Sequence, residues 1–209
     1  MKVYIFLNSG IARKGFYKEH FYSSKENSDK IICVNGGYLI ARSSDVHPHY
    51  VIGDLDSLKG DVIDQGPELI KYPEEKDFSD FELALQKASE LKPETIYVYG
   101  ALGGRKDHEI INILLLAYSN IHAVFIEEQI EIYNVIEKLN IHEKKGYICS
   151  LISFGGPCLV KEMEGFKYIL KEEILEPSSR GLSNIITDNE ACIHTGKGNL
   201  IVIVSRNIL

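Results

Sequence analysis

The first 125 residues alternate between short apolar runs and longer stretches with helical spacing. The Ser79 and Glu82 pair forms the S-x-x-E pattern of a capping box, which predicts a helix with Ser79 as its N-cap. The apolar runs are rich in β-branched and aromatic residues, as buried strands are, and occupy residues 2–7, 30–34, 50–52 and 95–99. Alternating strands and helices predict an N-terminal α/β domain with a Rossmann-like parallel sheet.

Each predicted helix has an apolar face. Aromatic residues spaced for one helical face lie at Phe16, Tyr17, Phe21 and Tyr22. The helix after Ser79 has its apolar positions at Phe81, Ala84, Leu85, Ala88 and Leu91. A third helix is expected from His108 to about Tyr118, with Asp107 as its N-cap.

From residue 129 onward the pattern changes to short apolar runs separated by turn signals. Examples are the runs GYICSLISF and LIVIV and the turn Gly155-Gly156-Pro157. Several short strands at close spacing predict an antiparallel sheet or β-sandwich. The expected organisation is therefore an α/β domain over residues 1–127 and a β-sandwich domain over residues 128–209.

Composition and charge narrow the class of protein. The net charge of −7 argues against general nucleic-acid binding, which needs a basic patch. The N-terminus lacks a signal-peptide pattern, and the most apolar region, residues 110–126, contains polar residues that make a membrane span improbable. Four scattered cysteines without a CxxC pair are typical of reduced thiols, so we expect a cytoplasmic protein.

The stretch HYVIGDLDSL, residues 49–58, ends an apolar run with Gly53 and then places Asp54 and Asp56 at the end of a predicted strand. In an open parallel sheet, ligands bind beyond the carboxyl ends of the strands. Two carboxylates there suit a divalent cation that carries phosphates. The alternative is a simple turn, because Asp and Ser favour turns. Taken alone, the stretch favours neither interpretation.

Further polar clusters follow other predicted strands. Asn35-Gly36-Gly37 ends the second strand and is either a ligand-approach loop or a plain turn. Lys76, Asp77 and Asp80 precede or begin the capped helix, where Asp80 also suits the helix dipole and Asp77 suits a solvated loop. Gly100, Gly103, Gly104 and Arg105 lead into the next helix, where free N–H groups and a guanidinium favour an anion such as phosphate. His108 is interpreted as an exposed first-turn residue.

Taken together, these pieces resemble the thiamine pyrophosphokinase family. The matching motifs lie in the family's order over nearly the whole chain: Asn35-Gly36-Gly37, Gly53-Asp54-Leu55-Asp56-Ser57, Lys76-Asp77-Phe78-Ser79-Asp80, Gly103-Gly104-Arg105-Lys106-Asp107-His108, Gly165-Phe166-Lys167-Tyr168 and Gly181-Leu182-Ser183-Asn184. The resemblance implies a homodimer with sites between subunits, and transfer of the pyrophosphoryl group of ATP to the hydroxyethyl oxygen of thiamine, releasing AMP.

The resemblance also implies residue roles. Asp54, Asp56 and Asp80 would hold magnesium. ATP would be bound by Asn8, Asn35, Gly36, Lys76, Asp77, Gly103, Gly104 and Arg105, with Asp107 near the reacting hydroxyl. Thiamine would contact Ser183, Asn184 and Tyr168. Metal and guanidinium suit such a transfer, which depends on positioning and charge neutralisation. Either Asp107 or Asp54 is a candidate proton acceptor.

Two features depart from the family pattern. Asn35 stands where the family usually has aspartate, so this position offers an amide oxygen without a charge. The chain has no tryptophan, and Tyr168 is either a π-face for the thiazolium cation or a packed strand residue. Without the resemblance, composition makes the segment around Ser183 and Asn184 a turn between strands.

Two alternatives to the leading function stay open. The same ATP site could pyrophosphorylate another primary alcohol, such as a hydroxymethylpterin. A non-catalytic sensor of thiamine diphosphate or a nucleotide is the second alternative. The substitution Asp54→Asn separates enzyme from sensor, because only an enzyme must lose turnover when its metal site is broken.

Overall fold

The structure is a computed structural model that describes residues 1–9, 15–54 and 66–206. It divides into two compact units. The first comprises Met1–Asn112 with Phe125–Glu128, and the second comprises Ile113–Val124 with Gln129–Leu209. None of the helices within the described ranges is long and apolar enough to cross a membrane.

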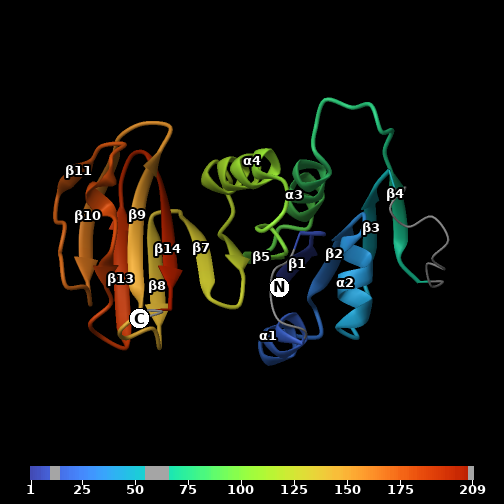
Figure 1. The fold of residues 1–209 in the computed structure, drawn as a ribbon, viewed down its shortest axis with the longest axis horizontal. Helices are drawn as coiled ribbons and strands as arrows, with labels where there is room; N and C mark the ends of the chain where they lie inside the picture. The colour runs from blue at the N-terminus through green and yellow to red at the C-terminus, as the bar shows by residue number, and fades with distance from the viewer. Residues whose placement is uncertain (10–14, 55–65, 207–209) are drawn as a thin grey trace. The chain divides into compact units, whose positions relative to one another are not determined.

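The first unit is built on a parallel sheet (Figure 1). Its strands follow the order β5-β1-β2-β3-β4, and each neighbouring pair is parallel. Their bounds are β1 Lys2–Phe6, β2 Lys30–Val34, β3 Tyr50–Gly53, β4 Glu68–Lys71 and β5 Thr95–Tyr99. The register pairs Phe6 with both Cys33 and Tyr99, and Val34 with Ile52, so the carboxyl ends of four strands lie together.

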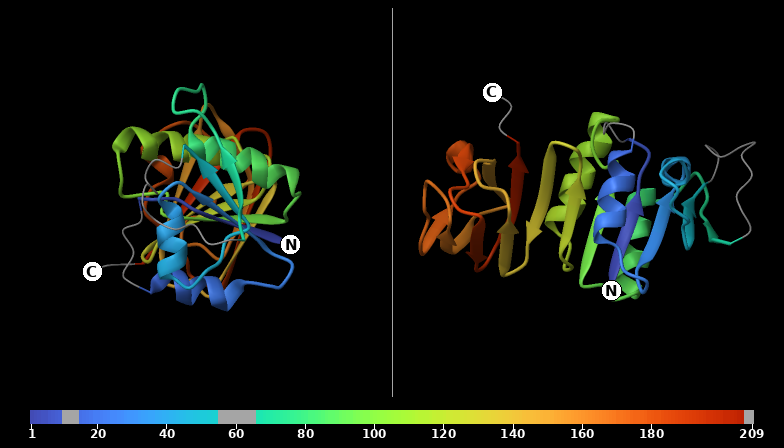
Figure 2. Two further views of the ribbon diagram at one scale, coloured as in Figure 1. Left: turned by 90° about the vertical axis from the view of Figure 1, so that its right-hand side faces the viewer. Right: turned by 90° about the horizontal axis from the view of Figure 1, so that it is seen from below.

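Helices cover both faces of this sheet (Figure 2). Helix α3 lies on one face, and α1 and α2 lie on the other. Strand β6 (Ala123–Ile126) adjoins β5, and its Phe125 packs edge-on against Phe81 of α3 at a centroid distance of 5.9 Å. The helices are α1 Phe16–Ser24, α2 Gly37–Ser43, α3 Asp80–Glu90 and α4 Lys106–Ala117. Apart from β4, these strands are mostly buried on both faces, which explains their near-continuous apolar sequences.

The second unit consists of antiparallel strands. Strands β7, β9, β12 and β14 pair in the order β12-β9-β14-β7, and a separate sheet has the order β11-β10-β13-β8. Their bounds are β7 Ile130–Val135, β8 Lys138–His142, β9 Ile148–Phe154, β10 Cys158–Glu164, β11 Glu173–Leu175, β12 Asn184–Ile185, β13 Glu190–Thr195 and β14 Asn199–Ser205.

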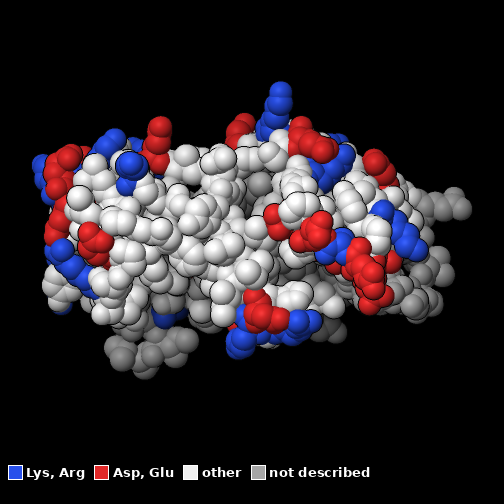
Figure 3. All heavy atoms as spheres, turned by 90° about the horizontal axis from the view of Figure 1, so that it is seen from above, with Lys and Arg blue, Asp and Glu red and all other residues white. Residues whose placement is uncertain are grey.

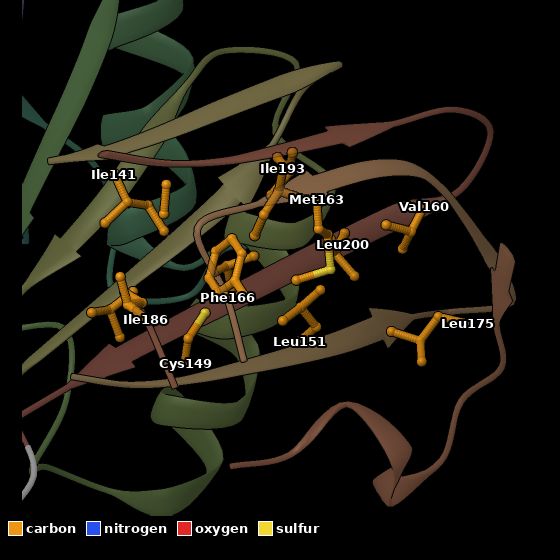
Figure 4. Packing of buried hydrophobic residues seen from close by; sticks show 14 of the residues in the cluster. Ile141, Cys149, Leu151, Val160, Met163, Phe166, Leu175, Ile186, Ile193 and Leu200 are labelled. Carbon is orange, nitrogen blue, oxygen red and sulfur yellow. The ribbon is translucent and has the colours of Figure 1, made fainter. Parts of the chain in front are cut away.

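Side chains from both of these strand sets share one apolar core (Figure 4). Leu151 and Leu200 come from β9 and β14, whereas Val160, Met163 and Ile193 come from β10 and β13. Strand β9 alternates buried and half-buried positions, as expected when one face of a strand packs on a core. The predicted order, an α/β part followed by antiparallel β-structure, is confirmed.

Some predicted helix details are wrong. Helix α4 begins at Lys106, so Asp107 lies inside its first turn and is not its N-cap, because the Asp107 carboxylate pairs with Arg105 instead. In α1 only Tyr17 and Phe21 are buried, since a spacing of four residues keeps just these two on the sheet side. Tyr22 is exposed.

Helix α2 and strand β4 are among the elements that were not predicted. Helix α2 starts directly after Gly36 and has only seven residues, too few for a helical period to stand out. Strand β4 lies at the end of the strand order and is mostly exposed, so it lacks the apolar run of a buried strand.

The capping box of α3 provides a test of the local folding signal. Ser79 Oγ accepts the Glu82 N–H at 3.2 Å, as the sequence predicts. Ser79→Ala should lower the free energy of unfolding by about 1 kcal/mol, the usual cost of losing an N-cap. The control Ser89→Ala removes an exposed hydroxyl near the other end of the same helix and should change stability by less than about 0.5 kcal/mol. Equal effects in urea denaturation would contradict a capping role.

Candidate active site

A pocket of about 600 Å³ opens at the carboxyl ends of the first unit's strands. It lies beyond β1, β2 and β3 and beside the first turns of α3 and α4. Seven of the residues predicted for the site line it: Asn8, Asn35, Asp54, Lys76, Asp80, Gly104 and Arg105. Further lining residues are Leu7, Ser9, Val34, Glu74, Phe78, Ser79, Phe81, His108, Glu109 and Asn112.

A hydrogen bond and an ion pair hold Asp80 in the pocket. Asn35 Nδ2 donates to Asp80 Oδ2 at 2.8 Å, and Lys76 Nζ lies 3.1 Å from Asp80 Oδ1. The side chains of Lys76 and Asp80 are only 15% and 19% exposed, so solvent screens this pair less than a surface pair. The carboxylate therefore has a fixed direction at the start of α3.

Asp80 Oδ1 can still accept a further interaction. It is buried, and apart from the Lys76 ion pair it accepts no hydrogen bond of ordinary geometry from the described part of the chain. A buried carboxylate oxygen with a free lone pair suits a cation ligand. Asp54 lines the same pocket, whereas Asp56 lies outside the described residues. Within the described ranges, no three His, Cys, Asp or Glu residues are grouped closely enough to hold a metal on their own.

Two glycines make room for the amide side chains of the pocket. A Cβ on Gly53 would lie 1.8 Å from Asn35 Oδ1, and a Cβ on Gly36 would lie 2.4 Å from Asn8 Nδ2. Gly53 also has φ of +138°, which an L side chain rarely adopts. Gly36 does not line the pocket itself. Its contribution is space for Asn8.

One N–H group of the glycine loop before α4, that of Gly103, is not free for an anion. The Gly103 N–H donates to Glu109 Oε1, and Lys106 Nζ pairs with Glu109 Oε2 at 2.6 Å. Glu109 follows the loop by only a few residues and accepts the Gly103 N–H from within the helix. Gly103 is exposed and does not line the pocket.

Arg105 is exposed at the rim of the pocket and is paired with Asp107. Its Nη2 and Nε donate to the two carboxylate oxygens of Asp107 at 2.6 Å and 3.1 Å. The hydrogen bonds from Arg105 hold the pKa of Asp107 at about 2, below its usual value. Asp107 does not line the pocket, and neither does the exposed Asp77. His108 is exposed as expected, yet it is one of the lining residues.

The pocket is lined by both basic and acidic groups. Lys76 and Arg105 line it together with Asp54, Glu74, Asp80 and Glu109. On the face drawn in Figure 3, acidic and basic side chains are interspersed, so this face carries no single continuous acidic patch. An anionic ligand can therefore find local positive charge despite the acidic composition.

The three residues predicted to contact thiamine lie in the second unit. Asn184 is buried, and its side chain bonds the backbone of Tyr168 on both sides: Oδ1 accepts from Tyr168 N at 3.0 Å and Nδ2 donates to Tyr168 O at 2.7 Å. Tyr168 is 61% exposed, and Lys167 Nζ lies 5.3 Å from its ring centroid. The Ser183 N–H donates to Ser150 Oγ at 3.1 Å. Asn184 thus fixes the backbone of Tyr168, which lies in a bend with its ring exposed and is not the packed strand residue of the alternative interpretation.

Comparisons with known proteins match two family patterns to this chain. The pattern described as "Thiamin pyrophosphokinase, catalytic domain" matches residues 21–127, and "Thiamin pyrophosphokinase, vitamin B1 binding domain" matches residues 137–200. The thiamine pyrophosphokinase of Bacillus subtilis is 33% identical over 188 residues, which cover 83% of this chain and 86% of that protein. Thiamine pyrophosphokinase 1 of rice is 27% identical over 76% of this chain and 66% of its own length.

A solved structure shares the fold over the full length. The crystal structure of thiamine pyrophosphokinase from Bacillus subtilis aligns with a TM-score of 0.81 and 24% identity, covering 100% of both chains. The catalytic-domain match and the curated relatives place the protein among the diphosphotransferases. The chain belongs to the thiamine pyrophosphokinase family, which confirms the resemblance seen in its motifs.

The contact between Gly53 and Asn35 provides a test of how the pocket is built. Gly53→Ala should lower the free energy of unfolding by about 2 kcal/mol or more, because the new methyl group meets the Asn35 side chain on a backbone that alanine disfavours. Gly66→Ala is the matched control, since a Cβ there meets nothing within 4 Å. Chemical denaturation measures both. If the two variants lose the same stability, the close approach of Asn35 is refuted.

Proposed function

We propose that this protein transfers the pyrophosphoryl group of ATP to the hydroxyethyl oxygen of thiamine, giving thiamine diphosphate and AMP. The observation that carries the proposal is the pocket at the carboxyl ends of the parallel strands. It combines a fixed carboxylate, Asp80, with two cationic side chains, Lys76 and Arg105, inside the segment that matches the catalytic domain. Transfer of a pyrophosphoryl group depends on such positioning and charge neutralisation.

Each charged group has a role in the proposed reaction. Asp54, Asp56 and Asp80 hold magnesium, which neutralises phosphate charge when it is bound. Asn35 keeps the Asp80 carboxylate oriented through its amide and adds no charge of its own. Lys76 and Arg105 attract the phosphates, and Arg105 exchanges its bonds to Asp107 for bonds to a phosphate oxygen. Asn8, Gly36, Asp77, Gly103 and Gly104 complete the ATP-binding segment.

The attacking oxygen of thiamine must lose a proton. Asp107 and Asp54 are the two candidate acceptors. When Arg105 turns to the nucleotide, Asp107 loses the partner that holds its pKa low, so its basicity rises at that moment. The oxygen then attacks the β-phosphorus, and AMP leaves with the electron pair of the broken bond.

The domain roles follow the two matching patterns. We assign ATP binding to the Rossmann-like α/β domain, residues 1–127, and thiamine binding to a β-sandwich domain, residues 128–209. Tyr168 offers its exposed ring to the thiazolium, with Asn184 bonded to its backbone, and Ser183 and Asn184 also contact thiamine. The active assembly is a homodimer with sites between subunits. The four unpaired cysteines suit a cytoplasmic enzyme.

Product analysis tests the reaction directly. After incubation with ATP, magnesium and thiamine, chromatography should detect thiamine diphosphate and AMP in equal amounts, because a single transfer at the β-phosphorus forms both. A parallel incubation with a hydroxymethylpterin in place of thiamine is the control for the acceptor. ADP with thiamine monophosphate, faster use of the pterin, or thiamine binding without turnover would each contradict the proposal.

A further inference from the structure

A buried carboxylate lies behind the glycine loop of the pocket. Glu127, directly after β6, is only 3% exposed. Its Oε2 accepts the Tyr17 hydroxyl at 2.6 Å. The backbone N–H groups of Gly100, Ala101 and Leu102 also face the carboxylate and favour its charged form. Oε1 itself is buried and completes no hydrogen bond of ordinary geometry with any described residue.

The same loop is held from its other side. Gly100 O accepts both the N–H and the hydroxyl of Ser9. Ala101 O accepts from Asn112 Nδ2 at 2.9 Å, and Asn112 is itself buried. The peptide groups at the start of the loop are therefore clamped, with their carbonyls bound by Ser9 and Asn112 and their N–H groups turned to Glu127.

Several residues that hold or end this loop also line the pocket. Ser9 and Asn112 line the pocket, as do Gly104 and Arg105 at the end of the loop. Glu127 does not line it, so it acts through the loop. The geometry points to Glu127 as a positioning residue that fixes the loop of residues 100–104 and thereby sets Arg105 for the phosphates of ATP. This inference rests on the proposed function, because it needs ATP in this pocket.

Ionisation of Glu127 adds a pH dependence. Burial raises the pKa of Glu127 to about 7, and the Tyr17 hydroxyl and the loop amides oppose that rise. The titratable group bonded to Glu127 is Tyr17 on α1. The Tyr17 ring contacts that of Tyr99 on β5, whose hydroxyl lies 2.8 Å from His20 Nδ1. The charged carboxylate binds three N–H groups better than the neutral acid does. The hold on the loop therefore weakens as pH falls through about 7.

The stability of the fold depends on pH in the opposite direction to the hold on the loop. A carboxyl whose pKa is raised by folding takes up a proton on folding between its ordinary pKa and the raised value. Its contribution to stability is therefore most favourable at low pH and declines as pH rises toward about 7. Glu127→Gln removes this titration, so the melting temperature of wild type should fall relative to that of the variant between about pH 5 and about pH 8.

Steady-state kinetics of three variants test the positioning role. In Glu127→Gln the Michaelis constant for ATP should rise roughly tenfold, the effect of one hydrogen bond to a charged group, while that for thiamine stays within about twofold. Wild type should lose ATP affinity below about pH 7, and the variant should not show this change. Tyr17→Phe should raise the ATP constant in the same direction.

Tyr4→Phe is the matched control for Tyr17→Phe. Tyr4 is buried in the same unit, and its hydroxyl shares a hydrogen bond with Ser24 Oγ at 3.1 Å, away from the loop. It should lose similar stability but keep the wild-type ATP constant. If Glu127→Gln fails to fold, the ATP constant of Tyr17→Phe tests the inference instead.

Two outcomes would overturn the inference. The first is a wild-type ATP constant and pH profile in Glu127→Gln, or in Tyr17→Phe where only that variant folds. The second is an equal change in Tyr4→Phe. Binding of a non-hydrolysable ATP analogue to wild type keeps this failure separate from that of the proposed function. Active, ATP-binding wild type with unaffected variants removes only the role of Glu127, whereas wild type that neither binds nor uses ATP overturns both.

Discussion

The hydrogen bond from Asn35 to Asp80 joins the end of β2 to the first turn of α3, and the pocket is arranged around it. Asn35 has a left-handed backbone with φ of 45°, a conformation that asparagine tolerates better than most residues. Its side chain occupies the space that Gly53 leaves free at the end of β3. Lys76 balances the charge of Asp80 from the preceding loop. The two strand ends and the helix start are thus bound into one polar unit.

A second constraint is that carboxylates of the chain itself face part of the glycine loop. The N–H groups of residues 100–102 are turned to Glu127, and the Gly103 N–H donates to Glu109. These N–H groups have partners or neighbours within the chain, and the Lys and Arg side chains that line the pocket are Lys76 and Arg105. This arrangement makes the direction of Arg105 depend on how firmly the loop is held, which connects a buried carboxylate to the chemistry of the pocket.

The sequence predicts the features that local rules govern. Capping of α3 by Ser79 depends on residues three apart, and continuous apolar runs predict the buried strands. The edge strand β4 has no such run, and Asp107 pairs with its neighbour Arg105 rather than capping α4. Glu127 could not be predicted, since its partner Tyr17 is 110 positions away and no local pattern links them. The family motifs led to the pocket but not to what supports it.

The central claim is that Asp80, oriented by Asn35 and Lys76, is a ligand of the divalent cation that accompanies ATP. Electron paramagnetic resonance of Mn²⁺ titrated into the protein with a non-hydrolysable ATP analogue measures this affinity directly. Asp80→Asn should weaken Mn²⁺ binding at least about tenfold, because the site loses a charged oxygen ligand. Glu90→Gln removes one negative charge and one ion pair from the other end of α3 and should leave the affinity unchanged. Wild-type Mn²⁺ affinity in Asp80→Asn would contradict the account.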